Sequence, residues 1–138
     1  MITIIYNFVS NINHNMNQMQ QVTKIMRVKE IAEAARARIL CGEDENPEIS
    51  RAFASDLMSD VLTLETDQTM LITGLANLQA IRTAEMSDIQ CILFARNKRV
   101  TDEMIALARE NNMVLLQTPC SVFYTSGLLF QAGIQPIF

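Results

Sequence analysis

From residue 69 onward, short apolar segments alternate with longer amphipathic ones, and this alternation limits the possible folds more than any other feature. The apolar segments are 69–73, 91–95 and 113–118, and helical patterns follow them at 75–87, 101–111 and 121–133. Strands covered on both faces read as near-continuous apolar runs, and helical connections between them favour parallel pairing. The sequence therefore predicts an α/β fold, a single three-layer sandwich with a mainly parallel sheet.

The residues before 69 extend the pattern. Segment 27–38 places four apolar residues at helical spacing, Val28, Ile31, Ala32 and Ala35. Segment 39–42 predicts a short strand that ends at Gly42, and 51–55 predicts an extended segment leading into a helix. The chain has 138 residues and is 49% hydrophobic, which is enough for one domain with a sizeable core.

The first 25 residues differ in composition from the rest. They contain five Asn between positions 7 and 17 and one charged side chain, Lys24. They lack the basic region and cleavage site of a signal peptide, and their apolar part is too short to span a bilayer. We expect 1–25 to be a non-native or disordered extension, translated from upstream sequence, and 26–138 to form the domain. The alternative is a genuine strand or helix that docks on a partner.

The sequence lacks the motifs of the common enzymes of this fold class. Its four glycines form neither a P-loop nor a dinucleotide-binding fingerprint, and no G-x-S-x-G is present. The only histidine, His14, lies in the first 25 residues, so a histidine mechanism in the domain is excluded. We therefore predict a protein that is not an enzyme and that has no catalytic residues, metal site or cofactor.

The charged residues and the cysteines limit the possible partners and the cellular compartment. The net charge is −4, and only "RNKR" at 96–99 forms a basic cluster. We interpret this cluster as a solvated loop and expect no nucleic-acid or membrane partner. Cys41, Cys91 and Cys120 are odd in number and widely separated, which argues against disulfides and zinc and favours a reducing cytoplasm. We expect Cys91 and Cys120 to be buried and Cys41 to be more exposed.

The segment "ASDLMSDVL", 54–62, contains two Ser-Asp pairs four residues apart. In one interpretation Ser55 or Asp56 caps a helix that starts near residue 56, and Asp60 lies on its solvated side. In the other, Asp56 and Asp60 share a helix face and hold a divalent cation with waters. Capping is the commoner role, and we favour it.

Several segments resemble the DRTGG domain family, from about Met26 to Gly133. "FASDLMSDVL" is similar to the family's segment with two Ser-Asp pairs, and "LIT" at 71–73 resembles its strand ending in Thr. "TDEMIALARENNMVLLQTPCSVFYTSGLL" resembles its closing helix, strand and helix. The chain departs from the family in lacking its glycine pair, because Arg51 and Ala52 stand where the two glycines would fall. Asn77 and Gln79 also stand where many members have His and Asn.

The resemblance implies a regulatory or structural domain. DRTGG domains are similar to the N-terminal, non-catalytic domain of HPr kinase/phosphorylase, and they occur with CBS domains in regulated pyrophosphatases. In some members they contribute to dimer contacts. Any kinase activity would belong to a catalytic domain that the resemblance does not include.

Two functions fit these observations. The first is a non-catalytic regulatory domain that binds a small ligand, nucleotide-like or phosphorylated, and acts through a partner protein. Ligands of parallel α/β sheets bind at the carboxyl ends of the strands, which gives the candidate ligand-binding residues Ser55, Asp56, Thr73, Thr118 and Ser121. Capping and turn formation are the alternative roles of the last three.

The second function is a structural homodimerisation or protein-interaction module without a ligand. The helix predicted at 75–86 has more apolar residues than one covered face requires. We therefore expect a homodimer that buries this helix, at Leu78 or Ile81, or the closing helix. The alternative is a helix packed deep in its own domain.

Overall fold

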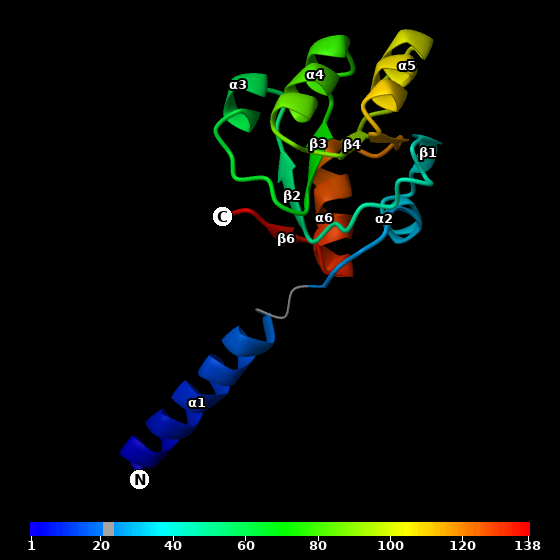
Figure 1. Cartoon of the computed structure of the whole chain (residues 1–138). Coiled ribbons are helices and arrows are strands. Elements are labelled where there is room, and N and C mark those ends of the chain that lie inside the picture. The colour runs from blue at the N-terminus through cyan, green and yellow to red at the C-terminus, as the bar shows by residue number, and fades with distance from the viewer. Residues whose placement is uncertain (21–23) are drawn as a thin grey trace.

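The computed structural model describes the backbone of residues 1–20 and 24–138 and the side chains of 1–13 and 24–138. A six-stranded sheet forms its centre, with the strand order β1-β5-β4-β3-β2-β6 (Figure 1). The strands are β1 Arg38–Cys41, β2 Arg51–Ala54, β3 Thr69–Thr73, β4 Cys91–Phe94, β5 Val114–Gln117 and β6 Gln135–Pro136. All neighbouring pairs are parallel except β1 with β5.

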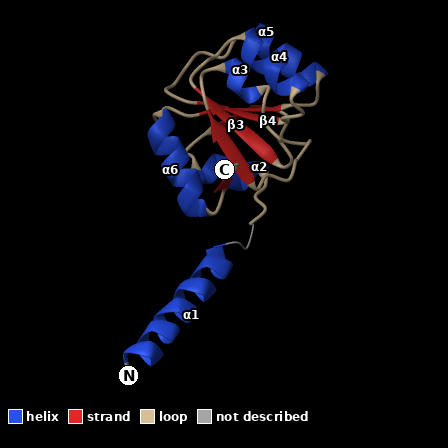
Figure 2. Cartoon of the chain, turned by 90° about the vertical axis from the view of Figure 1, so that its left-hand side faces the viewer, coloured by secondary structure: helices blue, strands red, loops and turns tan. Residues whose placement is uncertain are grey.

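Helices cover both faces of this sheet. They are α2 Val28–Ala34, α3 Met58–Val61, α4 Leu78–Met86, α5 Asp102–Glu110 and α6 Val122–Ala132. Figure 2 shows α2 and α6 on one face and α3, α4 and α5 on the other. The predicted three-layer α/β sandwich with a mainly parallel sheet is confirmed.

The core forms on both sides of the central strands because successive side chains of a strand point to opposite faces. In β3, Met70 and Ile72 pack with α2 and α6, whereas Leu71 packs with the opposite helices. In β4, Cys91 and Leu93 pack on the first side. Every residue of β3, β4 and β5 is buried, which explains why these strands read as unbroken apolar runs.

The helix boundaries follow local signals that the sequence carries. Thr101 accepts a hydrogen bond from the backbone N–H of Met104 and caps α5 as predicted. Gly133 ends α6 in the left-handed conformation, φ 116°, also as predicted. The helix expected from residue 75 begins only at Leu78, because the Asn77 side chain caps it by accepting from the N–H of Ala80.

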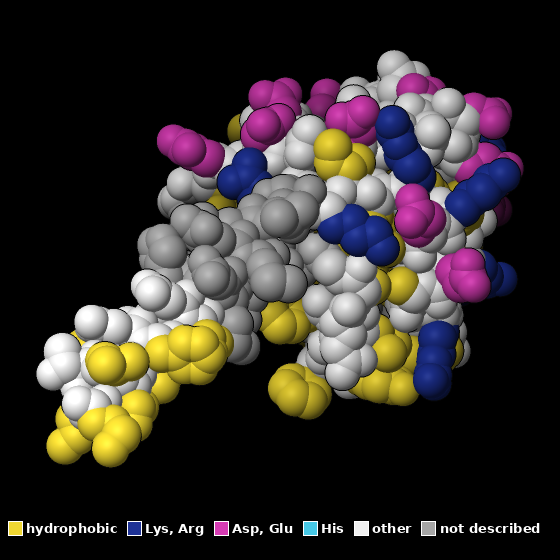
Figure 3. Space-filling view, turned by 90° about the horizontal axis from the view of Figure 1, so that it is seen from below, with side chains coloured by type: hydrophobic (Ala, Val, Ile, Leu, Met, Phe, Trp, Pro, Cys, Tyr) yellow, Lys and Arg dark blue, Asp and Glu magenta, His cyan; other side chains and the backbone are white. Residues whose placement is uncertain are grey.

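The first helix, α1 Ile2–Gln20, projects away from the domain (Figure 1). Figure 3 shows hydrophobic side chains along it, and those of Ile2, Ile5 and Phe8 are exposed. The side chain of His14 and residues 21–23 lie outside the described residues. That 1–25 is a non-native or disordered extension stays a prediction. Among the described residues, no helix is long and apolar enough to cross a membrane.

Candidate functional site

Asp56 joins the segment before α3 to the carboxyl end of β3. Its Oδ1 accepts hydrogen bonds from the hydroxyl of Thr73, at 3.0 Å, and from the backbone N–H of Gly74, at 2.7 Å. The Thr73 hydroxyl in turn accepts from the N–H of Leu75, at 3.0 Å. Thr73 is fully buried. At the end of the strand, these hydrogen bonds satisfy polar groups that would otherwise have no partner.

The expected helix cap by Ser55 or Asp56 is wrong. Helix α3 covers only four residues, its N-cap position is Leu57, and no side chain caps it. The Ser55 hydroxyl accepts from the N–H of Leu57, at 3.0 Å, and so forms a turn before the helix. The Asp56 carboxylate lies instead against the strand end, where two donors converge on one oxygen.

The second Ser-Asp pair has a different environment. Asp60 is exposed on α3, as predicted. Asp56 lies before the helix, so the two carboxylates do not share a helix face. In the part of the chain that the structure describes, no group of three or more His, Cys, Asp or Glu side chains is placed to hold a metal ion.

Thr118 and Ser121 connect β5 to the helices on the α2 and α6 face. The buried Thr118 hydroxyl donates to the backbone oxygen of Ala35, at 2.8 Å, just after α2. It also accepts from the N–H of Cys120, at 3.3 Å. Ser121 caps α6 by accepting from the N–H of Tyr124, at 3.1 Å. Both residues therefore have turn and capping roles.

The five candidate ligand residues thus form two groups at one edge of the sheet. Thr73 follows Leu71 in the alternation of β3 and faces the side of α3 and α4, where Asp56 lies. Thr118 follows Leu116 in β5 and faces α2. The structure brings Ser55, Asp56 and Thr73 together and places Thr118 and Ser121 on the other face. Whether any of them binds a ligand stays a prediction.

The loop after β4 links the two groups, and the sequence interpretation gave it no role. Arg96 donates its N–H to the backbone oxygen of Cys120, at 2.8 Å, and Asn97 donates to that of Thr118, at 2.9 Å. The Arg96 guanidinium lies 3.9 Å from the Asp56 carboxylate. It also passes over Gly74, where an added Cβ would lie 2.7 Å from its Nη2. Gly74 therefore leaves room for the guanidinium at the end of β3.

Positive side chains are concentrated around this loop. Arg38 donates to the Gln117 side chain, at 2.8 Å, and Gln117 donates to the backbone oxygen of Lys98. The Arg36 guanidinium lies 5.2 Å from the ring centre of Tyr124 on α6. Residues 35–38, 54–57, 95–103 and 118–121 hold five Lys or Arg and three carboxylates, namely Arg36, Arg38, Arg96, Lys98, Arg99, Asp56, Asp102 and Glu103. We call this set of loops the carboxyl edge.

Two arginines of the carboxyl edge have an uncommon backbone conformation. Arg36 has φ 53° and Arg96 has φ 62°, both in the left-handed region. For a residue with a Cβ this conformation costs on the order of 1 kcal/mol, and such strain is often found at functional sites. Both side chains are exposed, so the exposed guanidinium groups are held on strained backbone at the same edge of the sheet.

The expected exposure of two cysteines needs a correction. Cys41 is buried and donates weakly to the backbone oxygen of Met113, at 3.7 Å, whereas Cys120 is partly exposed. The reversal arises because β1 is covered by α5, while Cys120 lies in the turn before α6. Burial raises the pKa of Cys41, and it raises the pKa of the fully buried Cys91 to about 12.

A comparison with protein-family models identifies the family of the chain. The model of the DRTGG domain matches residues 30–132. The chain belongs to the DRTGG domain family. The resemblance predicted from the Ser-Asp segment and the closing helices is confirmed, and the family is one of regulatory domains. No curated protein matches the chain.

A solved structure supports the same fold. The chain is similar to the CBS and DRTGG domains of the regulatory region of Clostridium perfringens pyrophosphatase, with a TM-score of 0.63 and 16% identity. The match covers 78% of this chain and 47% of that chain, so this DRTGG domain spans about half the length of that region. The pyrophosphatase region was crystallised with its activator, diadenosine tetraphosphate.

Proposed function

We infer that this DRTGG domain is a regulatory module that binds a small phosphorylated ligand, of the nucleotide class, at the carboxyl edge and acts through a partner protein. The main support is the concentration of Arg36, Arg38, Arg96, Lys98 and Arg99 on an exposed edge of a chain with net charge −4. Arginine side chains match phosphate oxygens in geometry and charge.

The position of the edge adds to this inference. Ligands of parallel α/β sheets bind outside the carboxyl ends of the strands, and the loops after β3, β4 and β5 meet here. The N-terminus of the eleven-residue helix α6 opens on the same edge. The N-terminus of a helix favours an anion. The DRTGG-containing region of the pyrophosphatase takes a nucleotide polyphosphate, which supports the same ligand class.

A thermal-shift and calorimetry series tests the proposal with diadenosine tetraphosphate, ATP and inorganic pyrophosphate. At 100 times its dissociation constant, a ligand stabilises the folded state by about 2.7 kcal/mol, so the melting temperature rises by several degrees. The rise shrinks when salt is added, because these charges are exposed. Arg38→Ala and Arg96→Ala reduce the shift, whereas Arg82→Ala, an exposed arginine of α4, leaves it unchanged.

Two results count against the proposal. The first is a melting temperature that none of the three phosphates changes. The second is a shift that the two edge variants and the Arg82 variant reduce equally, because binding would then depend on overall charge and not on this edge. Thr73→Val tests the predicted role of the buried hydroxyl in the same series, since it removes the bond to Asp56 without changing the charge.

A further inference from the structure

Tyr124 lies in the first turn of α6, at the end of this helix that opens on the carboxyl edge. The guanidinium carbon of Arg36 lies over its ring, 5.2 Å from the ring centre. Tyr124 is 43% exposed, and Arg36 is exposed as well. An aromatic ring and the planar cation that stacks on it are therefore presented together at the surface.

The backbone that carries this pair is held from inside the domain. The buried hydroxyl of Thr118 donates to the backbone oxygen of Ala35, at 2.8 Å, directly before Arg36. The N–H of Tyr124 donates to the hydroxyl of Ser121, at 3.1 Å. A binding surface that is already positioned in the free protein loses less conformational entropy when a ligand binds.

The pair lies beside the arginines of the proposed phosphate site. Arg38 follows Arg36 by two residues, so their Cα atoms are at most about 7 Å apart. The N–H of Arg96 donates to the backbone oxygen of Cys120, at 2.8 Å, and Cys120 lies four residues before Tyr124. A ligand that contacts all of these side chains has phosphates at one end and a flat aromatic group at the other.

We propose that Tyr124 and Arg36 form a base subsite, in which the base of a nucleotide stacks on the Tyr124 ring beside the Arg36 guanidinium. The phosphates of the same ligand then lie toward Arg38 and Arg96, so this inference rests on the proposed function. Aromatic rings and arginine planes stack on any base, because every base has a π-face. The subsite therefore selects nucleotides over bare polyphosphates and does not select one base over another.

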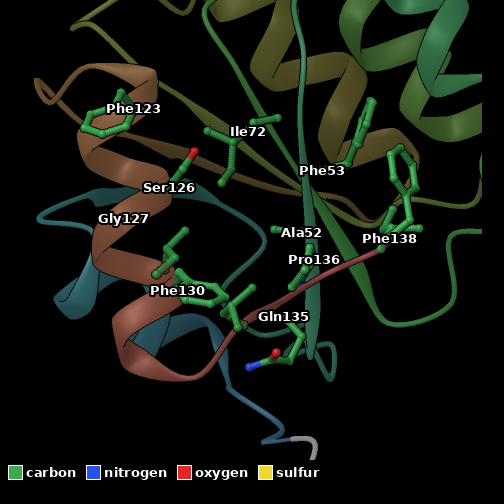
Figure 4. A pocket seen from close by; sticks show the side chains of 14 residues that line it. Ala52, Phe53, Ile72, Phe123, Ser126, Gly127, Phe130, Gln135, Pro136 and Phe138 are labelled. Atoms are coloured by element: carbon green, nitrogen blue, oxygen red, sulfur yellow. The ribbon is translucent and has the colours of Figure 1, made fainter. Parts of the chain in front are cut away.

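Phe123 provides a matched control in the same turn of α6. It is 88% exposed, but it lines the open apolar groove between α6 and the edge of the sheet formed by β2 and β6 (Figure 4). The two neighbouring aromatic side chains thus have different surroundings, the groove for Phe123 and the guanidinium of Arg36 for Tyr124.

Calorimetric titration of the full chain with ATP and with tripolyphosphate, which has three phosphates and no base, tests the proposal. The wild type is expected to bind ATP roughly fivefold or more tightly than tripolyphosphate, the factor that corresponds to one stacked base. Tyr124→Leu removes the ring and abolishes this preference, whereas Tyr124→Phe retains it. Phe123→Leu leaves both affinities unchanged.

Tyrosine fluorescence gives a second measurement that leaves the subsite intact. The chain has no Trp and two Tyr, Tyr6 and Tyr124, so the emission of the Tyr6→Phe variant comes from Tyr124 alone. ATP is expected to change this emission, after correction for the light that the base absorbs, and tripolyphosphate is expected to leave it unchanged.

The results separate the base subsite from the phosphate site. Equal affinities of the wild type for ATP and tripolyphosphate overturn the base subsite and leave the phosphate site in place. A preference for ATP that survives Tyr124→Leu, or that Phe123→Leu abolishes as well, also overturns the subsite. If the wild type binds neither compound, the proposed function fails and the base subsite fails with it.

Discussion

Asp56 and Asp60 occupy the same place in two Ser-Asp pairs, but the structure gives them different roles. Asp56 bonds to the hydroxyl of Thr73 and to the N–H of Gly74, whereas Asp60 points to solvent. The repeat in the sequence is therefore not a repeat in function. The first pair connects two strands, and the second belongs to the surface of a short helix.

Replacing each aspartate measures this difference. Asp56→Ala removes the acceptor of two hydrogen bonds and lowers the free energy of unfolding by about 1–2 kcal/mol. Asp60→Ala, the matched control, changes it by less than about 0.5 kcal/mol. Urea denaturation of both variants gives the comparison. Equal effects of the two substitutions would show that the contacts of Asp56 contribute nothing to stability.

The buried thiol of Cys91 makes the free energy of unfolding depend on pH. Burial raises the pKa of its thiol from 9.0 to about 12, so the folded state keeps the proton that the unfolded state releases above pH 9. The free energy of unfolding therefore falls as the pH rises from 9 to 12. Urea titrations at several pH values should show a shallower fall for Cys91→Ala. An identical slope in the variant would contradict this assignment.

At the scale of the elements, strands and helices with a strong apolar pattern were predictable, and elements defined by pairing were not. Strand β3 and helix α5 match the predicted segments closely, because burial on two faces or on one stripe leaves a period in the sequence. Strand β6 has two residues and one of them is Pro136, so it carries no period. Its partner β2 alone makes it a strand.

The candidate site was predictable only as an edge of the sheet. The rule that ligands bind at strand ends selected Thr73 and Thr118 correctly as residues of the carboxyl edge. It did not reveal that they lie on opposite faces or that Arg36 and Arg38 join Arg96 there. Those arginines come from a segment about 60 residues earlier, and the antiparallel pairing of β1 with β5 brings them together. The charged run after the buried strand β4 was the sequence feature from which basic side chains at this edge could have been predicted.

Gly42 ends β1 in a conformation that only glycine adopts easily. Its φ is +81°, and an added Cβ would lie 2.3 Å from the backbone oxygen of Met113. Gly42→Ala therefore lowers the free energy of unfolding by about 2–3 kcal/mol. Gly127→Ala, where the Cβ meets open space in a helix, raises it by about 0.5–1 kcal/mol. Thermal denaturation of both variants checks the opposite signs, and a neutral Gly42→Ala would refute the clash.

At the scale of the whole molecule, the surplus of apolar residues expected on the helix at 75–86 is explained mostly within the domain. Ile81 is fully buried in the core between α4 and the sheet, and Leu78 packs against the same core. Ile81→Glu would therefore unfold the chain and could not report on a dimer. Exposed apolar side chains also lie on α6, at Phe123 and Phe130, and this closing helix is the other location that the sequence allowed for a dimer contact.

The last prediction concerns the boundary of the folded unit. The core that packs α2 and α6 on the sheet begins at Met26, whose N–H and backbone oxygen pair with Ile49. The apolar side chains of Ile2, Ile5 and Phe8 are exposed and bury nothing in the domain. A chain that begins at Lys24, whose side chain lies beside Gly133, should therefore fold with the same urea midpoint as the full chain. It should also be more soluble, because exposed apolar helices promote association. A midpoint that is clearly lower, or loss of the cooperative transition, would show that residues 1–23 contribute to the fold and are not an extension of it.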